Sequence, residues 1–351
     1  MKLLYHGPLY KGATALQRAE AFQRNPDIAT EVLDTGAAPW VRPSLYHRIR
    51  NKLQFPVDRF DENRRIVERV RQVRPDVVIV DNSRQMDLGT LKVLRNLGVR
   101  KLVFYTPDDI LSRYNITFQL RRNFPEWDLV ITTKTFHLEE MKAFGVRRVF
   151  LAGNAYDPAV HHSLTPEEVG PEYEHFDAVF IGAHEPERRN SINALAESGV
   201  SVVVYGANGG WAGQSLHPGV TLRPSQFAAE YTRCIHHGKI ALGFLRKISR
   251  DLITQRSIEI AGMARPMLAE KTTEHDAHLV DGEEYVGFAD DRDLVDKARM
   301  LLSDDARRRA IGAAAYRRCL TSGYSVYDRG VQMLEAIAAL PERGAPAGRP
   351  S

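Results

Sequence analysis

Short apolar runs alternate with segments of helical periodicity along the chain, and this alternation constrains the fold more than any other feature. Residues 76–81 (DVVIVD) have no polar side chain between the two aspartates, as expected of a central strand covered by helices on both faces. Similar runs predict strands at 2–5, 101–105, 129–132, 149–151, 178–181, 202–205, 240–245, 266–269 and 285–288. Strands that alternate with helices at this spacing predict parallel sheets and an α/β fold.

The length of 351 residues predicts two domains rather than one. We expect an N-terminal Rossmann-like domain over residues 1–155 and a C-terminal one over residues 156–323. A helix over residues 324–340 is expected to follow. The tail at residues 341–351 is rich in Pro, Gly and Ala, so we expect it to be disordered.

Composition and motif content exclude several classes of protein. No run of 18 apolar residues occurs and the N-terminus enters a strand directly, so we expect a soluble, cytoplasmic protein. Cys234 and Cys319 are isolated from any metal-ligand spacing, which predicts core thiols. Gly7 and Gly12 do not form Gly-x-Gly-x-x-Gly, which argues against a nicotinamide or flavin cofactor. No cofactor is therefore predicted.

The N-terminal part of the chain is basic. Residues 1–155 carry 26 Lys and Arg against 17 Asp and Glu, whereas residues 156–351 carry 22 against 27. This asymmetry predicts an anionic acceptor or an acidic membrane surface near the N-terminal domain, the alternative being solvated helix faces. Residues 40–60 combine five cations with Trp, Tyr and Phe. This segment either lies against an anionic membrane surface or binds an acceptor, or it is an ordinary loop and helix edge. No nucleic-acid-binding motif accompanies the charge.

The stretch at residues 239–266 (KIALGFLRKISRDLITQRSIEIAGMARP) joins an apolar strand at 240–245 to a predicted helix at 252–263. Arg246, Lys247 and Arg250 lie at the junction, where helix amides and the helix dipole also favour a phosphate. Asp251 and Glu259 are eight residues apart, so they share one face if the helix includes both. A surface helix with two unrelated acids is the alternative.

Other chemically suggestive residues follow predicted strands. Asp108 and Asp109 (TPDD) come after the strand at 101–105, where they face a substrate or form an Asx-type turn. Gly12 lies in the first loop, where a glycine permits close approach of the backbone to a ligand, although an ordinary turn explains it equally. Two further glycine loops follow strands of the C-terminal domain and contain Gly182, Arg188, Arg189, Gly206 and Trp211.

Several of these stretches resemble the CgeB-like (spore maturation protein-like) glycosyltransferases. The resemblance rests on GPLYKGATALQRAEAF, YTPDD and FLRKISRDLITQRSIEIAG, and on their order along the chain. It implies a GT-B fold of the retaining group 1 type, in which two Rossmann-like domains face each other across a cleft and the C-terminal helix crosses back to the first domain. It also implies sugar transfer from a nucleotide-diphosphate sugar with retention and without an essential metal.

The resemblance further implies roles for individual residues. Glu259 holds the ribose of the nucleotide and Asp251 lies beside the donor sugar. The broader family pattern has Glu at the position of Asp251, so this chain departs from it with a shorter side chain. Asp108 or Asp109 orients hydroxyl groups beside the reacting sugar, and Lys247 acts on the leaving diphosphate. The remaining donor-binding residues are Gly12, Gly182, Arg188, Arg189, Gly206, Trp211 and Arg250.

The donor base is expected to be uridine or guanosine, and the acceptor an anionic or membrane-associated glycan or lipid. Peripheral association with the inner membrane surface is left open. Two other functions remain as alternatives. A nucleotide-sugar epimerase or hydrolase would use the same phosphate-binding residues, and an assay without acceptor distinguishes it. A non-catalytic nucleotide-sugar-binding protein is favoured if the three aspartates are remote from the nucleotide.

Overall fold

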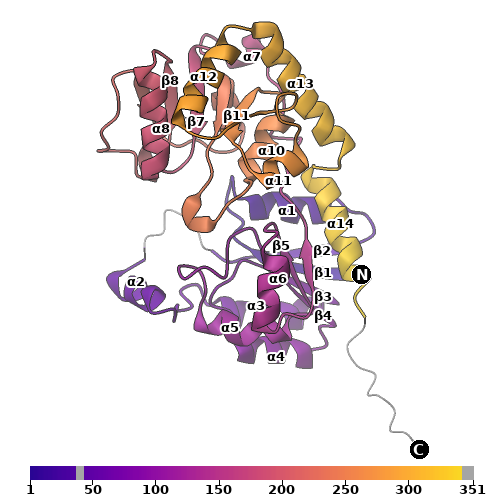
Figure 1. The fold of residues 1–351 in the computed structure, drawn as a ribbon. Helices are drawn as coiled ribbons and strands as arrows, with labels where there is room; N and C mark the ends of the chain where they lie inside the picture. Colours follow the sequence, from indigo (N-terminus) through magenta and orange to yellow (C-terminus); the bar gives the residue numbers. More distant parts are fainter. Residues whose placement is uncertain (37–42, 342–351) are drawn as a thin grey trace, which may run out of the picture. The chain divides into compact units, whose positions relative to one another are not determined.

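The computed structural model describes residues 1–36 and 43–341, and the chain divides into two compact units (Figure 1). Unit 1 consists of Met1–Gly153 together with the chain from Tyr327 onward. Unit 2 consists of Asn154–Val326. Each unit is built on one six-stranded sheet in which every pair of neighbouring strands is parallel.

The sheet of unit 1 has the strand order β2-β1-β3-β4-β5-β6. Its strands are β1 (Lys2–Gly7), β2 (Ala29–Asp34), β3 (Val77–Asp81), β4 (Lys101–Thr106), β5 (Leu129–Thr132) and β6 (Val149–Leu151). The α-helices of this part of the chain are α1 (Thr14–Gln23), α2 (Leu45–Lys52), α3 (Glu62–Val73), α4 (Leu88–Asn96), α5 (Phe118–Asn123), α6 (His137–Glu140) and, at its C-terminal end, α14 (Val326–Ala338).

Alternate residues of the unit 1 strands enter two different cores, as the two-residue repeat of a strand requires. Leu4 of β1 packs in a core that contains Ile66 of α3 and Leu91 of α4. Its neighbour Leu3 packs in a second core with Phe22 of α1 and several residues of α14. The C-terminal helix thus covers the same face of the unit 1 sheet as α1, which confirms the predicted return of this helix to the first domain.

The sheet of unit 2 has the strand order β12-β11-β10-β7-β8-β9. Its strands are β7 (Phe176–Ile181), β8 (Val202–Tyr205), β9 (Val220–Arg223), β10 (Gly238–Gly243), β11 (Met267–Glu270) and β12 (Val286–Phe288). Its α-helices are α7 (Pro166–Val169), α8 (Pro186–Glu197), α9 (Ala229–Ile235), α10 (Gln255–Gly262), α11 (Thr273–His278), α12 (Asp291–Leu302) and α13 (Asp305–Thr321). One core contains residues of α8 and α12, and the other contains residues of α9, α10 and α13.

The two parallel sheets confirm the predicted α/β fold class. Strands β2 and β9 were not predicted, because their residues are only partly buried and form no apolar run. The short helices α5, α7, α9 and α11 were also missed, since each spans fewer than two turns. Cys234 and Cys319 are buried and unpaired, as predicted for core thiols. Residues 37–42, which include the start of the basic segment at 40–60, and residues 342–351 of the predicted tail lie outside the described residues.

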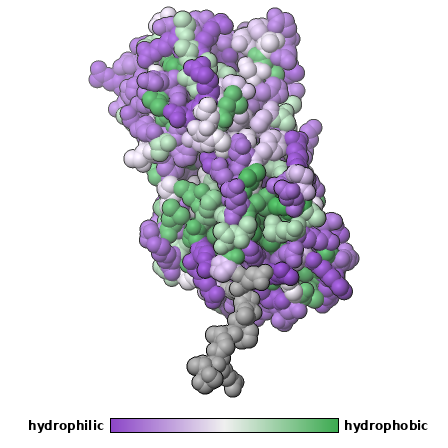
Figure 2. Space-filling view, turned by 90° about the vertical axis from the view of Figure 1, so that its right-hand side faces the viewer, coloured by the Kyte–Doolittle hydropathy of each residue, from purple (hydrophilic) through white to green (hydrophobic). Residues whose placement is uncertain are grey.

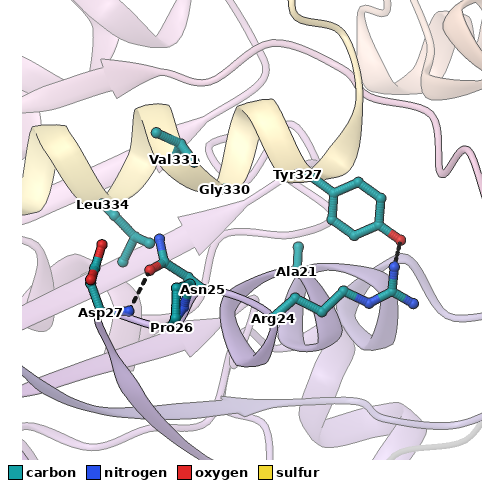
Figure 3. Close-up of a pocket in the computed structure, with 9 residues that line it drawn as sticks. All are labelled: Ala21, Arg24, Asn25, Pro26, Asp27, Tyr327, Gly330, Val331 and Leu334. Atoms are coloured by element: carbon teal, nitrogen blue, oxygen red, sulfur yellow. Dashed lines mark hydrogen bonds between the residues drawn. The ribbon is translucent and has the colours of Figure 1, made fainter.

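Unit 1 has a pocket of about 430 Å³ beside α14, formed with the end of α1 and the loop that follows it (Figure 3). The Arg24 guanidinium lies over the Tyr327 ring and donates a hydrogen bond to its hydroxyl. Val331 of α14 is 46% exposed here. Figure 2 shows hydrophobic residues on the corresponding face of unit 1. None of the predicted site residues lines this pocket. Within the described residues, no helix is both long and apolar enough to cross a membrane.

Candidate functional site

The order of the strands in unit 2 marks one place where a ligand is expected to bind. Strand β7 lies between β8 and β10, so the chain runs outward from β7 in two opposite directions along the sheet. In open α/β sheets, ligands bind outside the carboxyl ends of the strands at such a switch point. The loops that leave β7 and β10 therefore form the candidate site, and both belong to the predicted glycine and cationic stretches.

The loop after β7 is held by a close backbone approach. The Gly182 amide donates to the Tyr205 carbonyl (3.1 Å), and the Gly182 carbonyl accepts the indole N–H of Trp211 (2.8 Å). A Cβ atom at Gly206 would lie 2.3 Å from the Gly182 carbonyl oxygen, so this position requires glycine. Trp211 is 0% exposed. The buried indole therefore supports the loop through this hydrogen bond and is not available to a ligand in solvent.

Arg188, in the first turn of α8, donates hydrogen bonds to both loops. Its Nη1 donates to the Ala183 carbonyl (2.9 Å) and its Nε to the Leu245 carbonyl (3.3 Å). Burial lowers the pKa of Arg188 from its ordinary value, but a guanidinium remains charged in proteins. Arg189 instead donates to the side chain of the adjacent Asn190 (3.1 Å). The structure thus distinguishes the two predicted arginines, because Arg188 alone of this pair contacts both loops.

Further cations surround Arg188. The positive charges of Arg256 and Arg246 both lower the pKa of Arg188, although less than burial does. Arg246 pairs with Glu185 (3.3 Å), and Lys247 pairs with the Glu270 carboxylate. Arg188, Arg246, Lys247 and Arg256 thus gather in this part of unit 2. Arg256 Nε is buried and has no hydrogen-bond partner among the described residues.

Glu270, at the end of β11, also supports the loop after β10. Its Oε1 accepts the Leu245 amide (2.8 Å), while its other oxygen pairs with Lys247. The carboxylate thus positions the predicted catalytic lysine relative to the backbone of the β10 loop. Its position at the end of a predicted strand, beside a polar loop, was a signal that the sequence analysis did not use.

Helix α10 is shorter than predicted, and Asp251 lies outside it. The helix begins at Gln255 with Thr254 as its N-cap, three residues later than expected. Arg250 has a φ of +50°, and the Asp251 amide donates to the Arg246 carbonyl (3.2 Å), so both residues belong to the preceding turn. The condition under which Asp251 and Glu259 would share one face of a helix is not met, because only Glu259 is helical.

Glu259 lies on α10 with a side chain that is 12% exposed. Its Oε1 is 3.8 Å from Nε2 of His161, whose Nδ1 accepts the Asp157 amide (2.9 Å). Burial, reinforced by the charge of Glu259, raises the pKa of Tyr231 well above its ordinary value, so Tyr231 carries a neutral hydroxyl. The sequence analysis missed His161, Tyr231 and Arg256. Arg256 was recognisable as a further cation beside the predicted helix start, whereas nothing in the sequence marks His161.

The two acids after β4 in unit 1 differ in burial and in partners. Asp109 is 0% exposed, and its Oδ1 is 3.3 Å from Nε2 of the equally buried His137. Asp108 is half-buried and accepts a hydrogen bond from Asn82 Nδ2 (2.8 Å) at the end of β3. Gly12 is exposed in the first loop and has a φ of +88°, which explains the glycine by backbone conformation alone.

Comparison with known proteins gives one match to a family model. Residues 187–335, which run from α8 into α14, match a model described as "Glycosyl transferase-like". No curated protein matches the chain by sequence at a significant level. Among the described residues, no group of three or more His, Cys, Asp or Glu side chains is arranged to hold a metal ion.

Solved structures with the same fold cover nearly the whole chain at low identity. HepE from Anabaena, solved with UDP-glucose, aligns with a TM-score of 0.65 and 14% identity over 97% of this chain and 100% of its own. Sucrose-phosphate synthase from Thermosynechococcus elongatus aligns with a TM-score of 0.66 and 11% identity over 97% and 99% of the two chains. An epimerase described as a UDP-N-acetylglucosamine 2-epimerase from Listeria monocytogenes aligns with a TM-score of 0.55 and 13% identity over 96% of each chain.

These similarities define the class of the protein. Its two parallel α/β sheets have the GT-B fold, as the resemblance implied. The glycosyl transferase-like match covers residues 187–335, and together with this fold it supports a glycosyltransferase.

Proposed function

We propose that the protein transfers a sugar from a UDP-sugar donor, bound by unit 2, to an anionic acceptor. The observation that carries this proposal is the cation-rich junction of the β7 and β10 loops, where Arg188 bridges two backbone carbonyls. The uridine base is supported by the Anabaena HepE structures, which were solved with UDP-glucose and with UDP. Within the glycosyltransferases, the motifs of this chain favour the CgeB-like group and retention of configuration.

The diphosphate of the donor is assigned to the junction of the two loops. Arg188 and Arg256 lie close enough for their charges to interact, so together they supply positive charge for the phosphate oxygens. Lys247 is 56% exposed and supplies a further charge from the β10 loop. The nucleotide leaves as a diphosphate, and prepositioned cations stabilise the charge that develops on it in the transition state. Arg250 and Gly182 are proposed to contribute to the same cradle.

Glu259 is proposed to hold the ribose hydroxyl groups of the nucleotide. A carboxylate accepts two hydrogen bonds from a vicinal diol, and such charge-assisted bonds are stronger than neutral ones. His161 and Tyr231 lie near this carboxylate on α10. Gly206 and Trp211 are proposed to act indirectly, because both contact the Gly182 carbonyl and so hold the conformation of the Gly182 loop.

The acceptor is proposed to bind to the basic unit 1. Asp108 is half-buried at the carboxyl end of the sheet, which suits a residue that orients sugar hydroxyl groups. Asp109 is proposed to support this turn through its pairing with buried His137. Asp251, in the turn before α10, is proposed to lie beside the donor sugar. Metal-independent transfer remains part of the proposal, with the cations of unit 2 in place of a divalent ion.

The proposal is tested by a calorimetric binding panel of UDP, GDP, ADP, CDP and dTDP, with and without Mg²⁺. We expect UDP to bind best and without a requirement for Mg²⁺. The variant Glu259→Ala should weaken UDP binding by about tenfold or more, because a charge-assisted hydrogen bond contributes about 1.5–3 kcal/mol. Glu197→Ala, which removes an exposed acid near the end of α8, is the matched control and should bind UDP normally. Binding of none of the five nucleotides would contradict the proposal.

An epimerase is the second candidate, favoured by the structural similarity to the Listeria epimerase. The two functions differ in their need for an acceptor. Incubation with UDP-glucose or UDP-N-acetylglucosamine alone, followed by NMR of the sugar, separates them. A new sugar epimer formed without acceptor would establish the epimerase and overturn the transferase proposal.

A further inference from the structure

A small polar cavity of about 180 Å³ lies in unit 2, away from the candidate nucleotide site. Lys239 at the start of β10 and Pro266 just before β11 line it, together with the first turn of α13. These residues belong to the amino ends of the strands. The Gly182 and Leu245 loops leave the opposite, carboxyl edge of the same sheet, so the two sites do not share residues.

Two buried arginines line this cavity, and each has an unused donor. Arg265 and Arg308 are both 6% exposed. Nη2 of Arg265 donates to Glu174 (2.8 Å), and Nη2 of Arg308 donates to Asp305 (2.8 Å). The Nε atoms of both residues are buried and have no hydrogen-bond partner among the described residues. The other guanidinium nitrogens are bonded, since Arg265 also donates to the Gly238 carbonyl (2.7 Å) and Arg308 to the Leu301 carbonyl (2.7 Å). A buried donor without an acceptor is unfavourable, so an oxyanion that reaches these Nε atoms would be favoured.

The charges around the cavity are unbalanced. The residues that line it include four cations, Lys239, Arg265, Arg308 and Arg309, but only the carboxylates Glu174 and Asp305. Asp305 pairs with both Arg308 and Arg309, at 2.8 Å in each case. Lys239 pairs with Asp177 (2.9 Å), which is not part of the lining, and this leaves an excess of one positive charge. The positive end of the α13 dipole adds to this excess.

The size and the donors of the cavity select the class of ligand. Its volume is below the roughly 300–1,000 Å³ of sites for drug-sized ligands, so it suits a small ion or a single functional group. Guanidinium groups match the geometry of phosphate oxygens and bind them with charge-assisted hydrogen bonds. We propose that this cavity binds a phosphoryl oxyanion, either free phosphate or the phosphoryl group of a small metabolite. The proposal goes beyond sugar transfer and does not depend on it.

The test is calorimetric titration of the full-length protein with inorganic phosphate at an ionic strength held constant with NaCl. Arg309 is 72% exposed, so Arg309→Gln removes one cation of the cavity without disturbing the core. We expect the Kd for phosphate to rise at least fivefold in this variant. Arg307→Gln is the matched control, because Arg307 is exposed on the same turn and does not line the cavity. Its Kd should equal that of the wild type.

A second variant tests the unused donors directly. Arg265→Lys keeps the positive charge but removes the planar guanidinium, so we expect at least a tenfold rise in Kd with an unchanged far-UV circular dichroism spectrum. Glucose 6-phosphate in place of phosphate distinguishes the two sources. Binding of both ligands indicates a phosphoryl group, and binding of phosphate alone indicates the free ion.

Three results would overturn the proposal. The first is an absence of phosphate binding to the wild type. The second is equal affinity in the wild type and in both cavity variants. The third is a loss of phosphate binding in Lys247→Ala but not in Arg309→Gln, which would place the ion at the nucleotide site instead.

Discussion

The variant Lys247→Ala separates transition-state stabilisation from nucleotide binding. Lys247 is 56% exposed and pairs with Glu270, and exposed ion pairs of this kind contribute about 0–1 kcal/mol to stability. The fold should therefore survive the change. Loss of one donor to the leaving group costs about 2.7–4 kcal/mol of activation free energy, which is about 100- to 1,000-fold in kcat. The exposure of the lysine favours the lower end of this range, about 100-fold.

The assay measures release of UDP from UDP-glucose in the presence of a candidate acceptor, together with calorimetric Kd values for UDP. Lys271→Ala is the matched control, because Lys271 is 49% exposed and pairs with Asp281 (2.7 Å). We expect kcat to fall about 100-fold in Lys247→Ala and to stay unchanged in Lys271→Ala. The UDP affinity of Lys247→Ala should change less than fivefold. An equal loss of kcat in both variants, or a loss of UDP binding in proportion to kcat, would refute the assigned role.

Three further predictions concern the fold. Gly206→Ala should lower both Tm and UDP affinity, because the new Cβ would lie 2.3 Å from the Gly182 carbonyl oxygen. Arg18→Met should cost about 3–5 kcal/mol in urea unfolding, because it leaves the buried Asp81 carboxylate without its cation. Burial lowers the pKa of His236 to about 4, so its contribution to stability is present above pH 6.5 and is lost as the pH falls towards 4. The urea midpoint should therefore fall across this range, and less steeply in His236→Gln.

Controls distinguish these effects from general destabilisation. Gly213→Ala also replaces a glycine with alanine in unit 2, and the new Cβ would have no atom within 4 Å, although the φ of +81° at this position adds some strain. It should lower UDP affinity less than Gly206→Ala does. Arg71→Met removes an exposed arginine from α3 and should leave the urea midpoint nearly unchanged. An unaltered midpoint in Arg18→Met, or an identical pH dependence in His236→Gln, would contradict the corresponding argument.

The sequence predicted the parallel α/β architecture because fully buried strands such as Val77–Asp81 are apolar in every interior position. It did not predict β2 or β9, since a strand at the sheet edge needs no continuous apolar run. It also placed the start of α10 three residues too early. The backbone at Arg250 adopts a positive φ that no local residue pattern predicts, and the helix begins only after this turn, at Gln255.

The candidate site was predictable where loops follow strands, and less so where distant residues meet. Gly182, Arg188 or Arg189, and Lys247 were proposed because each follows a predicted strand and because the resemblance implies a role for it, and loops at the carboxyl ends of parallel strands lie together. Contacts such as that of His161 with Glu259 join residues 98 positions apart, and they depend on how α10 packs in its unit. The burial of Trp211 could likewise not be predicted from the sequence, because a tryptophan in a glycine-rich loop suits both a binding surface and a core.

The central claim is that unit 2 binds the nucleotide at the junction of the β7 and β10 loops. Hydrogen–deuterium exchange of the full chain with and without saturating UDP tests it most directly, since the amides themselves report the contact. The account predicts that UDP slows exchange at residues 182–188 and 245–259, with no change at residues 305–309 of α13. Protection confined to unit 1, or to the amino edge of the unit 2 sheet, would contradict it.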